Sequence, residues 1–410
     1  MKRVAIIGAG AAGCFCAIHL KRRMPEADVT VFEAGKKPLA KVAVTGGGRC
    51  NLTNSFEGIR SLSEAYPRGE RVMKRALQTF SQEDTCRWFR SEGVPLVLQE
   101  DHCWFPRSQD AMDIVRCLLR GMKGVDLRLG SKVQRIETAG QAGHDGSSAI
   151  PGLTGYLVDG EPFDAVVVTT GGAPRGLPFL EGLGLEIVPP VPSLFTFTVR
   201  DASLNALAGI VTEASIGLAG THFRADGPLL ITDWGFSGPA ALKLSSYAAR
   251  HLADTGYKGT LSVNWLSRNE AEVRSLLQET GASNPRKQLS STPLSLSGRL
   301  WDHLLGKAGI RSDIRWAELG SKGLNRLTAL LTGDSYPLEG KSRFREEFVT
   351  AGGVALSNIN PGTLECKQHP GLYFAGEVLD IDAITGGFNL QAAWSTGYIV
   401  SQSLERAGKS

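Results

Sequence analysis

The segment GAGAAG, residues 8–13, constrains the fold of this chain more strongly than any other stretch. It follows the β-rich run Val4–Ile7, and the residues after it favour a helix up to about Arg23. In a Gly-x-Gly-x-x-Gly turn, the first glycine permits a tight bend and the second lets the backbone approach a pyrophosphate. The third lets the helix pack closely on the strand, and the helix N-terminus attracts negative charge. The sequence therefore predicts a βαβ unit that binds a dinucleotide.

The end of the next expected strand carries an acidic residue. Val29–Phe32 is β-rich and leads into Glu33, twenty residues after Gly13. A carboxylate at this position accepts hydrogen bonds from ribose hydroxyls. The same charge repels a 2′-phosphate, so FAD and NAD both fit and NADP is disfavoured at this site. The alternative is a glycine-rich turn with an incidental surface Glu, and the strand–turn–helix context favours the nucleotide.

A second glycine-rich stretch, TGGGRCN at residues 45–51, lies in an expected polar loop over 41–55. Three adjacent glycines leave consecutive N–H groups free, and the following arginine adds positive charge. Such a loop wraps a pyrophosphate or lies against a flavin ring. The alternative is a flexible surface loop, but bulky flanking residues and nearby amide side chains are unusual in a linker. Lys41 lies just upstream of the glycines.

Two further segments resemble the edges of nucleotide sites. Val166–Gly172 is an apolar strand that ends in small residues, or else a simple strand-to-loop turn. Near the C-terminus, Gly376 and Glu377 precede the adjacent glycines Gly386 and Gly387, which lead into an expected helix over 389–405. A helix N-terminus beside glycines suits a phosphate or the polar edge of a flavin.

Domain boundaries are expected where the composition changes. Pro189–Pro192 marks one boundary, and a second lies near 335–345. We expect residues 1–190 and 341–410 to form one Rossmann-like α/β domain, and residues 191–340 to form an insert of strands and helices. Outside the insert, helices are expected at 71–80, 82–92 (capped by Ser81) and 109–122. Strands are expected there at 102–105, 125–129, 131–137, 153–158, 163–169 and 372–375, with a loop at 139–152. Inside it, strands are expected at 194–199, 209–218, 229–233 and 260–265, and helices at 239–252, 268–280, 296–308 and 323–332.

Four long segments together resemble one known family. MKRVAIIGAGAAG, KVAVTGGGRCNLTN, TAGGVAL and GLYFAGEVLDIDAITGGFNLQAAWSTG are similar to the BaiN/YhiN-type flavoproteins, a family of NAD(P)/FAD-dependent oxidoreductases that includes aminoacetone oxidase-like proteins. The resemblance implies FAD in a Rossmann-like domain of the two-dinucleotide-binding type. It also implies that the insert is a β-barrel with a small helical subdomain. One departure is Phe388, where the family often has Tyr.

Carried onto this sequence, the resemblance implies cofactor contacts from segments far apart in the chain. The first glycine turn would contact the pyrophosphate, and Glu33 the ribose. Val133, in a strand beside the adenine, would contribute its backbone. The residues expected to contact FAD are Gly8, Gly10, Ala12, Gly13, Glu33, Lys41, Thr45, Gly46, Gly47, Gly48, Arg49, Cys50, Asn51, Val133, Thr170, Gly171, Gly376, Glu377, Gly386, Gly387, Phe388 and Asn389.

Composition narrows the cellular context and the partners. The formal net charge of +4 on 410 residues is weak, so neither nucleic acid nor a membrane surface is the expected partner. Seven cysteines without a CxxC pair indicate reduced thiols in a cytoplasm and no structural zinc. The apolar run after Met1–Arg3 resembles a signal peptide but is too short for a membrane span, and the glycine turn explains it better.

The expected activity is that of a bacterial FAD-dependent oxidoreductase that transfers hydride at the flavin N5. A second Gly-x-Gly-x-x-Gly is absent from the sequence, so NAD(P)H or a small-molecule substrate would dock directly on the flavin, with oxygen as another electron partner. No general base is assigned, although His102 is a candidate and Cys50 is a candidate redox thiol. Residues 286–345 hold 11 basic and 5 acidic side chains. This excess leaves open a flavin-dependent RNA-modifying protein, and a non-catalytic FAD-binding module is the third alternative.

Overall fold

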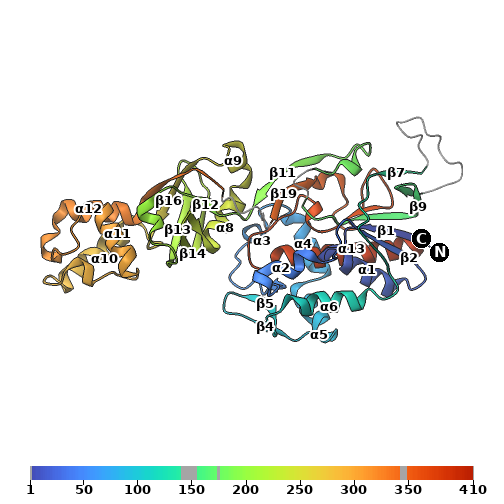
Figure 1. Ribbon diagram of the computed structural model, residues 1–410, viewed down its shortest axis with the longest axis horizontal. Helices are drawn as coiled ribbons and strands as arrows, with labels where there is room; N and C mark the ends of the chain where they lie inside the picture. The colour runs from blue at the N-terminus through green and yellow to red at the C-terminus, as the bar shows by residue number, and fades with distance from the viewer. Residues whose placement is uncertain (1, 140–154, 173–175, 342–348, 410) are drawn as a thin grey trace. The chain divides into compact units, whose positions relative to one another are not determined.

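The computed structural model describes residues 2–139, 155–172, 176–341 and 349–409. The chain divides into two compact units (Figure 1). Unit 1 comprises Met1–Val191 and Val349–Ser410, and unit 2 comprises Pro192–Phe348. Unit 1 is thus assembled from the two ends of the chain, and both termini belong to it.

The main sheet of unit 1 is a five-stranded parallel sheet with β1 (Arg3–Ile7) at its centre. The strand order is β20-β10-β1-β2-β6, and every adjacent pair is parallel. Because the strands are parallel, the carboxyl ends of β1, β2 and β10 meet at one edge. The expected α/β Rossmann-like arrangement is confirmed. The other strands are β2 (Asp28–Glu33), β6 (Asp126–Leu129), β10 (Ala165–Val168) and β20 (Leu372–Phe374).

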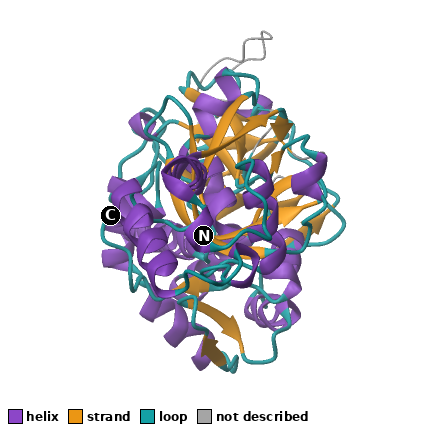
Figure 2. Cartoon of the chain, turned by 90° about the vertical axis from the view of Figure 1, so that its left-hand side faces the viewer, coloured by secondary structure: helices purple, strands orange, loops and turns teal. Residues whose placement is uncertain are grey.

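The chain contains both helices and strands (Figure 2), and two helices of unit 1 bring the chain ends together. A Cβ on Gly397 of α13 (Phe388–Lys409) would lie 2.7 Å from the carbonyl oxygen of Ala12 in α1 (Ala11–Arg23). Only glycine therefore allows these helices to pack so closely. Buried aromatic rings such as Phe15 and Trp394, 5.3 Å apart, fill the space beside this contact. The C-terminal helix is thus part of the core of unit 1.

Two expected helices before residue 100 are confirmed as α4 (Glu70–Thr79) and α5 (Gln82–Ser91). The expected cap is present, because the Ser81 side chain accepts from the Asp84 N–H and the Asp84 carboxylate accepts from the Ser81 N–H. The remaining elements of unit 1 are α2 (Ala40–Gly48), β3 (Thr53–Asn54), α3 (Leu62–Ala65), β4 (Leu96–Leu98), β5 (Cys103–Pro106), α6 (Ala111–Gly121), β7 (Ile136–Thr138), β8 (Tyr156–Val158), β9 (Glu161–Phe163), β11 (Ile187–Ser193) and β19 (Val349–Val354).

Four local expectations were wrong. The strand expected at 194–199 is reduced to β12 (Phe197–Thr198). The loop expected at 41–55 begins as helix α2, because helix-compatible residues precede the glycines, and regular helical dihedrals end at Thr45. The strand expected at 131–137 is reduced to β7, and Val133 lies in no strand. The helix expected at 239–252 breaks at Ala248 into α8 (Gly238–Tyr247) and α9 (Ala249–Asp254). The expected loop at 139–152 lies outside the described residues, apart from its first residue.

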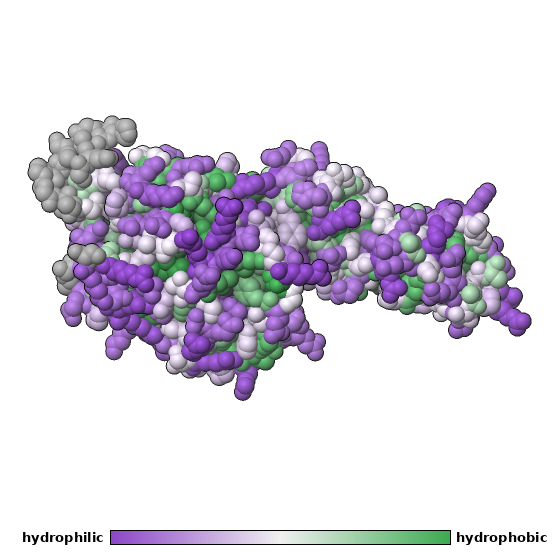
Figure 3. Space-filling view, turned by 180° about the vertical axis from the view of Figure 1, so that it is seen from behind, coloured by the Kyte–Doolittle hydropathy of each residue, from purple (hydrophilic) through white to green (hydrophobic). Residues whose placement is uncertain are grey.

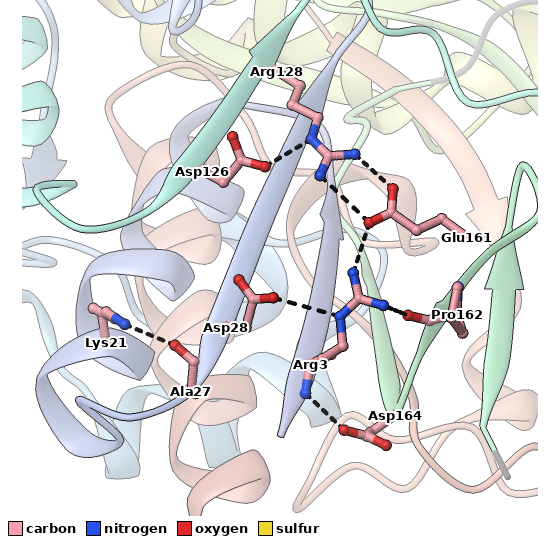
Figure 4. A network of polar contacts seen from close by, with 9 residues as sticks. All are labelled: Arg3, Lys21, Ala27, Asp28, Asp126, Arg128, Glu161, Pro162 and Asp164. Atoms are coloured by element: carbon pink, nitrogen blue, oxygen red, sulfur yellow. Dashed lines mark hydrogen bonds and ion pairs between the residues drawn. The ribbon is translucent and has the colours of Figure 1, made fainter. Parts of the chain in front are cut away.

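An ion-pair network ties the sheet of unit 1 to the neighbouring hairpin strand β9 (Figure 4). The Glu161 carboxylate accepts from Arg3 at 2.7 Å and from Arg128 at 2.6 Å. Arg3 also contacts Asp28, and Arg128 contacts Asp126. The hydrogen bond from Arg128 is the largest cause of the lowered pKa of Glu161, and the charge of Arg128 and the hydrogen bond from Arg3 lower it further. The network therefore joins β1, β2, β6 and β9 through charged groups at their margins.

Unit 2 contains a seven-stranded antiparallel sheet in the order β17-β16-β13-β14-β15-β12-β18. Residues 334–341 form both outer strands, because β17 pairs with β16 and β18 pairs with β12. Helices pack beside the sheet around a core that includes Trp265 and Trp301. The elements are β12 (Phe197–Thr198), α7 (Ala202–Asn205), β13 (Val211–Leu218), β14 (Arg224–Thr232), β15 (Gly235–Ser237), α8 (Gly238–Tyr247), α9 (Ala249–Asp254), β16 (Gly259–Asn264), α10 (Glu270–Ser283), α11 (Gly298–Lys307), α12 (Gly320–Gly333), β17 (Asp334–Leu338) and β18 (Gly340–Lys341).

The surface is mostly polar on the face drawn in Figure 3, where apolar residues form only small patches. Large apolar side chains that are exposed belong to different elements, with Val44 of α2 at 66% and Val211 of β13 at 60%. Among the helices of the described residues, none has the length and apolar character needed to cross a membrane.

Candidate functional site

The first glycine turn lies at the carboxyl edge of the parallel sheet, between β1 and α1. Gly8 has φ +110°, and a Cβ there would be 2.6 Å from the carbonyl oxygen of Thr169. A Cβ on Gly13 would be 2.0 Å from the Gly8 carbonyl oxygen, so both positions require glycine. A Cβ on Gly10, by contrast, would meet no atom within 4 Å. The turn therefore leaves free space in front of Gly10, where a phosphate could approach the backbone.

Glu33 ends β2 beside this turn, and its carboxylate helps to shape it. One oxygen accepts from the Ala9 N–H at 2.9 Å and the other accepts from the Gly35 N–H at 2.7 Å. Carboxylate oxygens have further lone pairs that remain available to ribose hydroxyls. The residue is half-buried, so it is held in place while staying accessible.

A cavity of about 230 Å³ opens at the same edge. Four residues expected from the sequence line it, namely Gly8, Glu33, Val133 and Thr170. Val133 reaches the cavity from irregular backbone and not from the expected strand. Gly172, at the end of the segment Val166–Gly172 singled out in the sequence, also lines the cavity. Sequence reasoning missed several other lining residues, because no recognisable motif surrounds them; these are Ser131, Lys132, Gly176, Leu177 and Phe179.

The second glycine stretch forms a tight left-handed turn at the end of α2. Gly46, Gly47 and Gly48 have φ values of +58°, +69° and +82°, a conformation that other residues rarely adopt. Cβ atoms on Gly47 and Gly48 would meet nothing within 4 Å. Arg49 folds back over the turn, with its side chain 3.2 Å from the Gly46 carbonyl oxygen. The turn thus presents a second open stretch of backbone, next to the exposed Val44.

Cys50 and Asn51 follow this turn and are held in different ways. Cys50 is fully buried, and burial raises the pKa of its thiol to about 12. A thiol with that pKa stays protonated at neutral pH, which argues against a reactive redox cysteine. The side-chain oxygen of Asn51 is buried and has no hydrogen-bond partner. Because buried polar atoms are normally paired, this oxygen marks a place where a donor from a ligand would fit.

A third group of expected residues meets around the side chain of Glu377. One carboxylate oxygen accepts from the Thr350 N–H at 2.8 Å, and the other pairs with the Lys41 ammonium at 3.3 Å. A Cβ on Gly171 would be 3.6 Å from this carboxylate. Lys41 is 67% exposed, so its pairing with Glu377 is screened by water. Segments near residues 41, 171, 350 and 377 therefore converge in unit 1.

The start of α13 carries the last expected residues. Gly387 has φ +88°, and its Cβ would be 2.6 Å from the Asn51 side-chain oxygen, so this glycine lies against the second glycine turn. The Asn389 side chain accepts from the Ala383 N–H and donates to the Ala383 carbonyl, both at 2.9 Å. Phe388 is buried, and its carbonyl accepts from the Tyr66 hydroxyl at 2.8 Å. The helix N-terminus is thus fixed beside residues 46–51.

The other sequence candidates lie apart from these groups or are already paired. His102 is exposed on the β4–β5 turn, with its ring 3.4 Å from the Glu57 carboxylate. In unit 2, Lys307 pairs with the buried Asp334 and Arg311 pairs with Asp313, so these two basic side chains are already engaged in ion pairs. In the described part of the chain, no group of three or more His, Cys, Asp or Glu side chains is arranged to hold a metal.

Comparisons with known proteins give full-length matches. The family model described as "HI0933-like protein Rossmann domain" matches residues 2–403. A ribosomal RNA dihydrouridine synthase of Escherichia coli K12 is 31% identical over 99% of this chain and 98% of its own length. A 3-dehydro-bile acid delta(4,6)-reductase of Clostridium scindens is 29% identical over 98% of this chain and 99% of its own.

A second ribosomal RNA dihydrouridine synthase, from Haemophilus influenzae, is 30% identical over 98% of both chains. Among solved structures, a 3-ketosteroid delta1-dehydrogenase from Sterolibacterium denitrificans superposes with a TM-score of 0.50 at 12% identity. It covers 99% of this chain and 100% of the other, and the likeness is one of fold alone. The full-length family match and the relatives at 30% identity or more show that this chain belongs to the HI0933-like family.

Proposed function

We propose that this protein is an FAD-dependent reductase that delivers hydride to an electron-poor carbon–carbon double bond. The observation that carries the proposal is the pair of open glycine turns at residues 8–13 and 46–48 in one unit, together with the cavity that holds Glu33. One turn and the cavity suit a pyrophosphate and an adenosine, and the other turn suits a flavin.

The residues present fit FAD at several independent points. Backbone at Gly10 would meet the pyrophosphate, and Glu33 would accept from the adenosine ribose. Gly47 and Gly48 would leave room for the flavin side of the cofactor, and the unpartnered Asn51 oxygen would accept from one of its donors. The remaining expected contacts, from Ala12, Lys41, Thr45, Gly46, Arg49, Cys50, Val133, Thr170, Gly171, Gly376, Glu377, Gly386, Gly387, Phe388 and Asn389, belong to the same proposal.

Bound FAD would supply hydride transfer at its N5 atom, which no amino-acid side chain provides. The protein's own part is to bind, orient and exclude water. Phe388, at the start of α13, is buried and would form one side of the proposed flavin site. The Tyr66 hydroxyl holds Phe388 in place by donating a hydrogen bond to its carbonyl. Burial keeps the Cys50 thiol protonated, so its role here is packing.

The names of the relatives support a common chemistry. Forming dihydrouridine saturates the double bond of a uracil next to a carbonyl, and a delta(4,6)-reductase of a 3-dehydro bile acid saturates double bonds conjugated to a ketone. We therefore infer that the substrate contains a double bond conjugated to a carbonyl. Two relatives named for ribosomal RNA favour uridine in RNA, and the relative named for bile acids makes an unsaturated 3-oxo steroid the second candidate.

The test begins with the visible spectrum of the purified protein, recorded anaerobically before and after addition of NADH or NADPH. We expect an oxidised-flavin spectrum that bleaches with one of the two nucleotides. The reduced protein is then mixed with a uridine-containing RNA or with a 3-oxo-4,6-diene steroid, and reoxidation is followed. Folded protein that binds no FAD from excess would overturn the cofactor, and flavin that never turns over with any donor would support a non-catalytic module.

We also propose a fold for the insert and limits for the domains. Because residues 334–341 pair with both ends of the antiparallel sheet of unit 2, a closed β-barrel with a helical subdomain is the arrangement that these pairings favour. The proposed domains are 1–190 with 341–410 for FAD binding, and 191–340 for the insert.

A further inference from the structure

A groove with an unusual lining runs along helix α4 in unit 1. It has a volume of about 420 Å³ and is lined by Arg71, Lys74, Arg75, Gln78 and Pro361. The first four follow the spacing i, i+3, i+4, i+7, so they share one face of the helix. Three cations therefore line one side of the groove, over about 6 Å of helix.

These cations are available to a ligand. All three side chains are exposed, while Val72, Met73 and Ala76 on the opposite face of α4 are buried in unit 1. Within the part of the chain that the structure describes, no ion pair engages the three cations, and no carboxylate lines the groove. The three side chains extend from a helix whose opposite face is packed into unit 1, so the backbone positions that carry the charges are fixed.

The start of α4 is anchored to the segment that leads into the proposed flavin site. Arg68 forms an ion pair with the fully buried Asp382, and a Cβ on Gly69 would be 2.5 Å from the Ile381 side chain. The Ile384 N–H donates to the Ala65 carbonyl at 2.9 Å. Residues 381–384 continue directly into Gly386 and Gly387. The helix that carries the groove is therefore fixed, at its start, to the segment that leads into the end of the proposed site.

We propose that this groove binds the sugar–phosphate backbone of the RNA substrate and thereby presents a uridine to the flavin. The inference rests on the proposed function and adds the surface that recognises the polymer. Several exposed cations in a row suit a repeating anion, because each phosphate contact releases a counterion. A single small anion is usually enclosed by backbone N–H groups at a turn or helix end, and this groove is open and lined by side chains.

The test compares two triple variants of the FAD-loaded protein. R71Q/K74Q/R75Q removes the three charges of the groove, and R286Q/K287Q/K322Q removes three exposed charges from the basic part of unit 2. Glutamine keeps good helix propensity. The probe is a 30-nucleotide uridine-containing single-stranded RNA, titrated by fluorescence anisotropy between 50 and 200 mM KCl.

We expect the groove variant to bind this RNA at least about tenfold more weakly at 50 mM salt. Its salt dependence should become shallower by about two units of log Kd per log salt, from three lost single-strand phosphate contacts. The unit 2 variant should bind like the parent. Flavin content and bleaching by NAD(P)H should be equal in all three proteins, which shows that folding is intact.

Two results would overturn the groove as the RNA site. They are unchanged RNA affinity in the groove variant and equal losses of RNA affinity in both variants. If the groove variant is unstable, R71K/R75K should bind RNA like the parent and the single change K74Q should show a partial loss. Strong RNA binding without reduction of uridine would contradict the proposed function but not the RNA site in the groove. Uridine reduction with parental kcat/KM in the groove variant would contradict the RNA site alone.

Discussion

At the scale of single residues, Glu33 carries the most specific prediction. Replacement by Gln leaves one acceptor oxygen for two backbone N–H donors, at Ala9 and Gly35, and turns an N–H₂ group towards one of them. An unpaired buried donor costs about 1–3 kcal/mol. We expect Glu33→Gln to weaken FAD binding by about tenfold or more. Flavin fluorescence titration measures this, with Glu26→Gln, an exposed change of equal charge, as the control; equal affinities for both variants would contradict the role of Glu33.

At the scale of elements, replacing two helical glycines by alanine is expected to change the free energy of unfolding in opposite directions. Gly397→Ala would place a Cβ 2.7 Å from the backbone oxygen of Ala12, so α13 and α1 must separate. We expect a loss of about 1–3 kcal/mol in the free energy of unfolding. Gly306→Ala in α11 meets nothing within 4 Å and should gain about 0.5–1 kcal/mol from helix propensity. Urea denaturation measures both, and a stabilised Gly397→Ala would show that this close packing is not required.

At the scale of the whole molecule, each of the two units has its own core. FAD at one hundred times its dissociation constant adds about 2.7 kcal/mol to the unit that binds it. We expect two calorimetric transitions, of which the one for unit 1 rises by about 5–10 °C with FAD and the one for unit 2 stays in place. Glu33→Gln should reduce the shift at the same FAD concentration. A single transition, or equal shifts of both, would contradict independent unfolding of the units.

Residue types at short spacing are enough to predict the parts of this protein that depend on local chemistry. The glycine turn at residues 8–13, the strand that ends in Glu33 and the Ser81 cap follow from residue types at short spacing, and each is present where expected. Local backbone preferences and capping hydrogen bonds act over a few residues, so a single sequence is enough to read them.

Which distant segments meet depends on long-range packing, and the sequence does not predict it. The convergence of Lys41, Gly171, Thr350 and Glu377 depends on pairing between strands more than 100 residues apart, and no local pattern specifies it. Val133 reaches the cavity from irregular backbone, which periodicity cannot predict. The spacing of the cations on α4 can be read from the sequence, but the groove beside them also needs Pro361, which lies about 290 residues away in the chain. Long-range packing, and not local propensity, therefore builds the site.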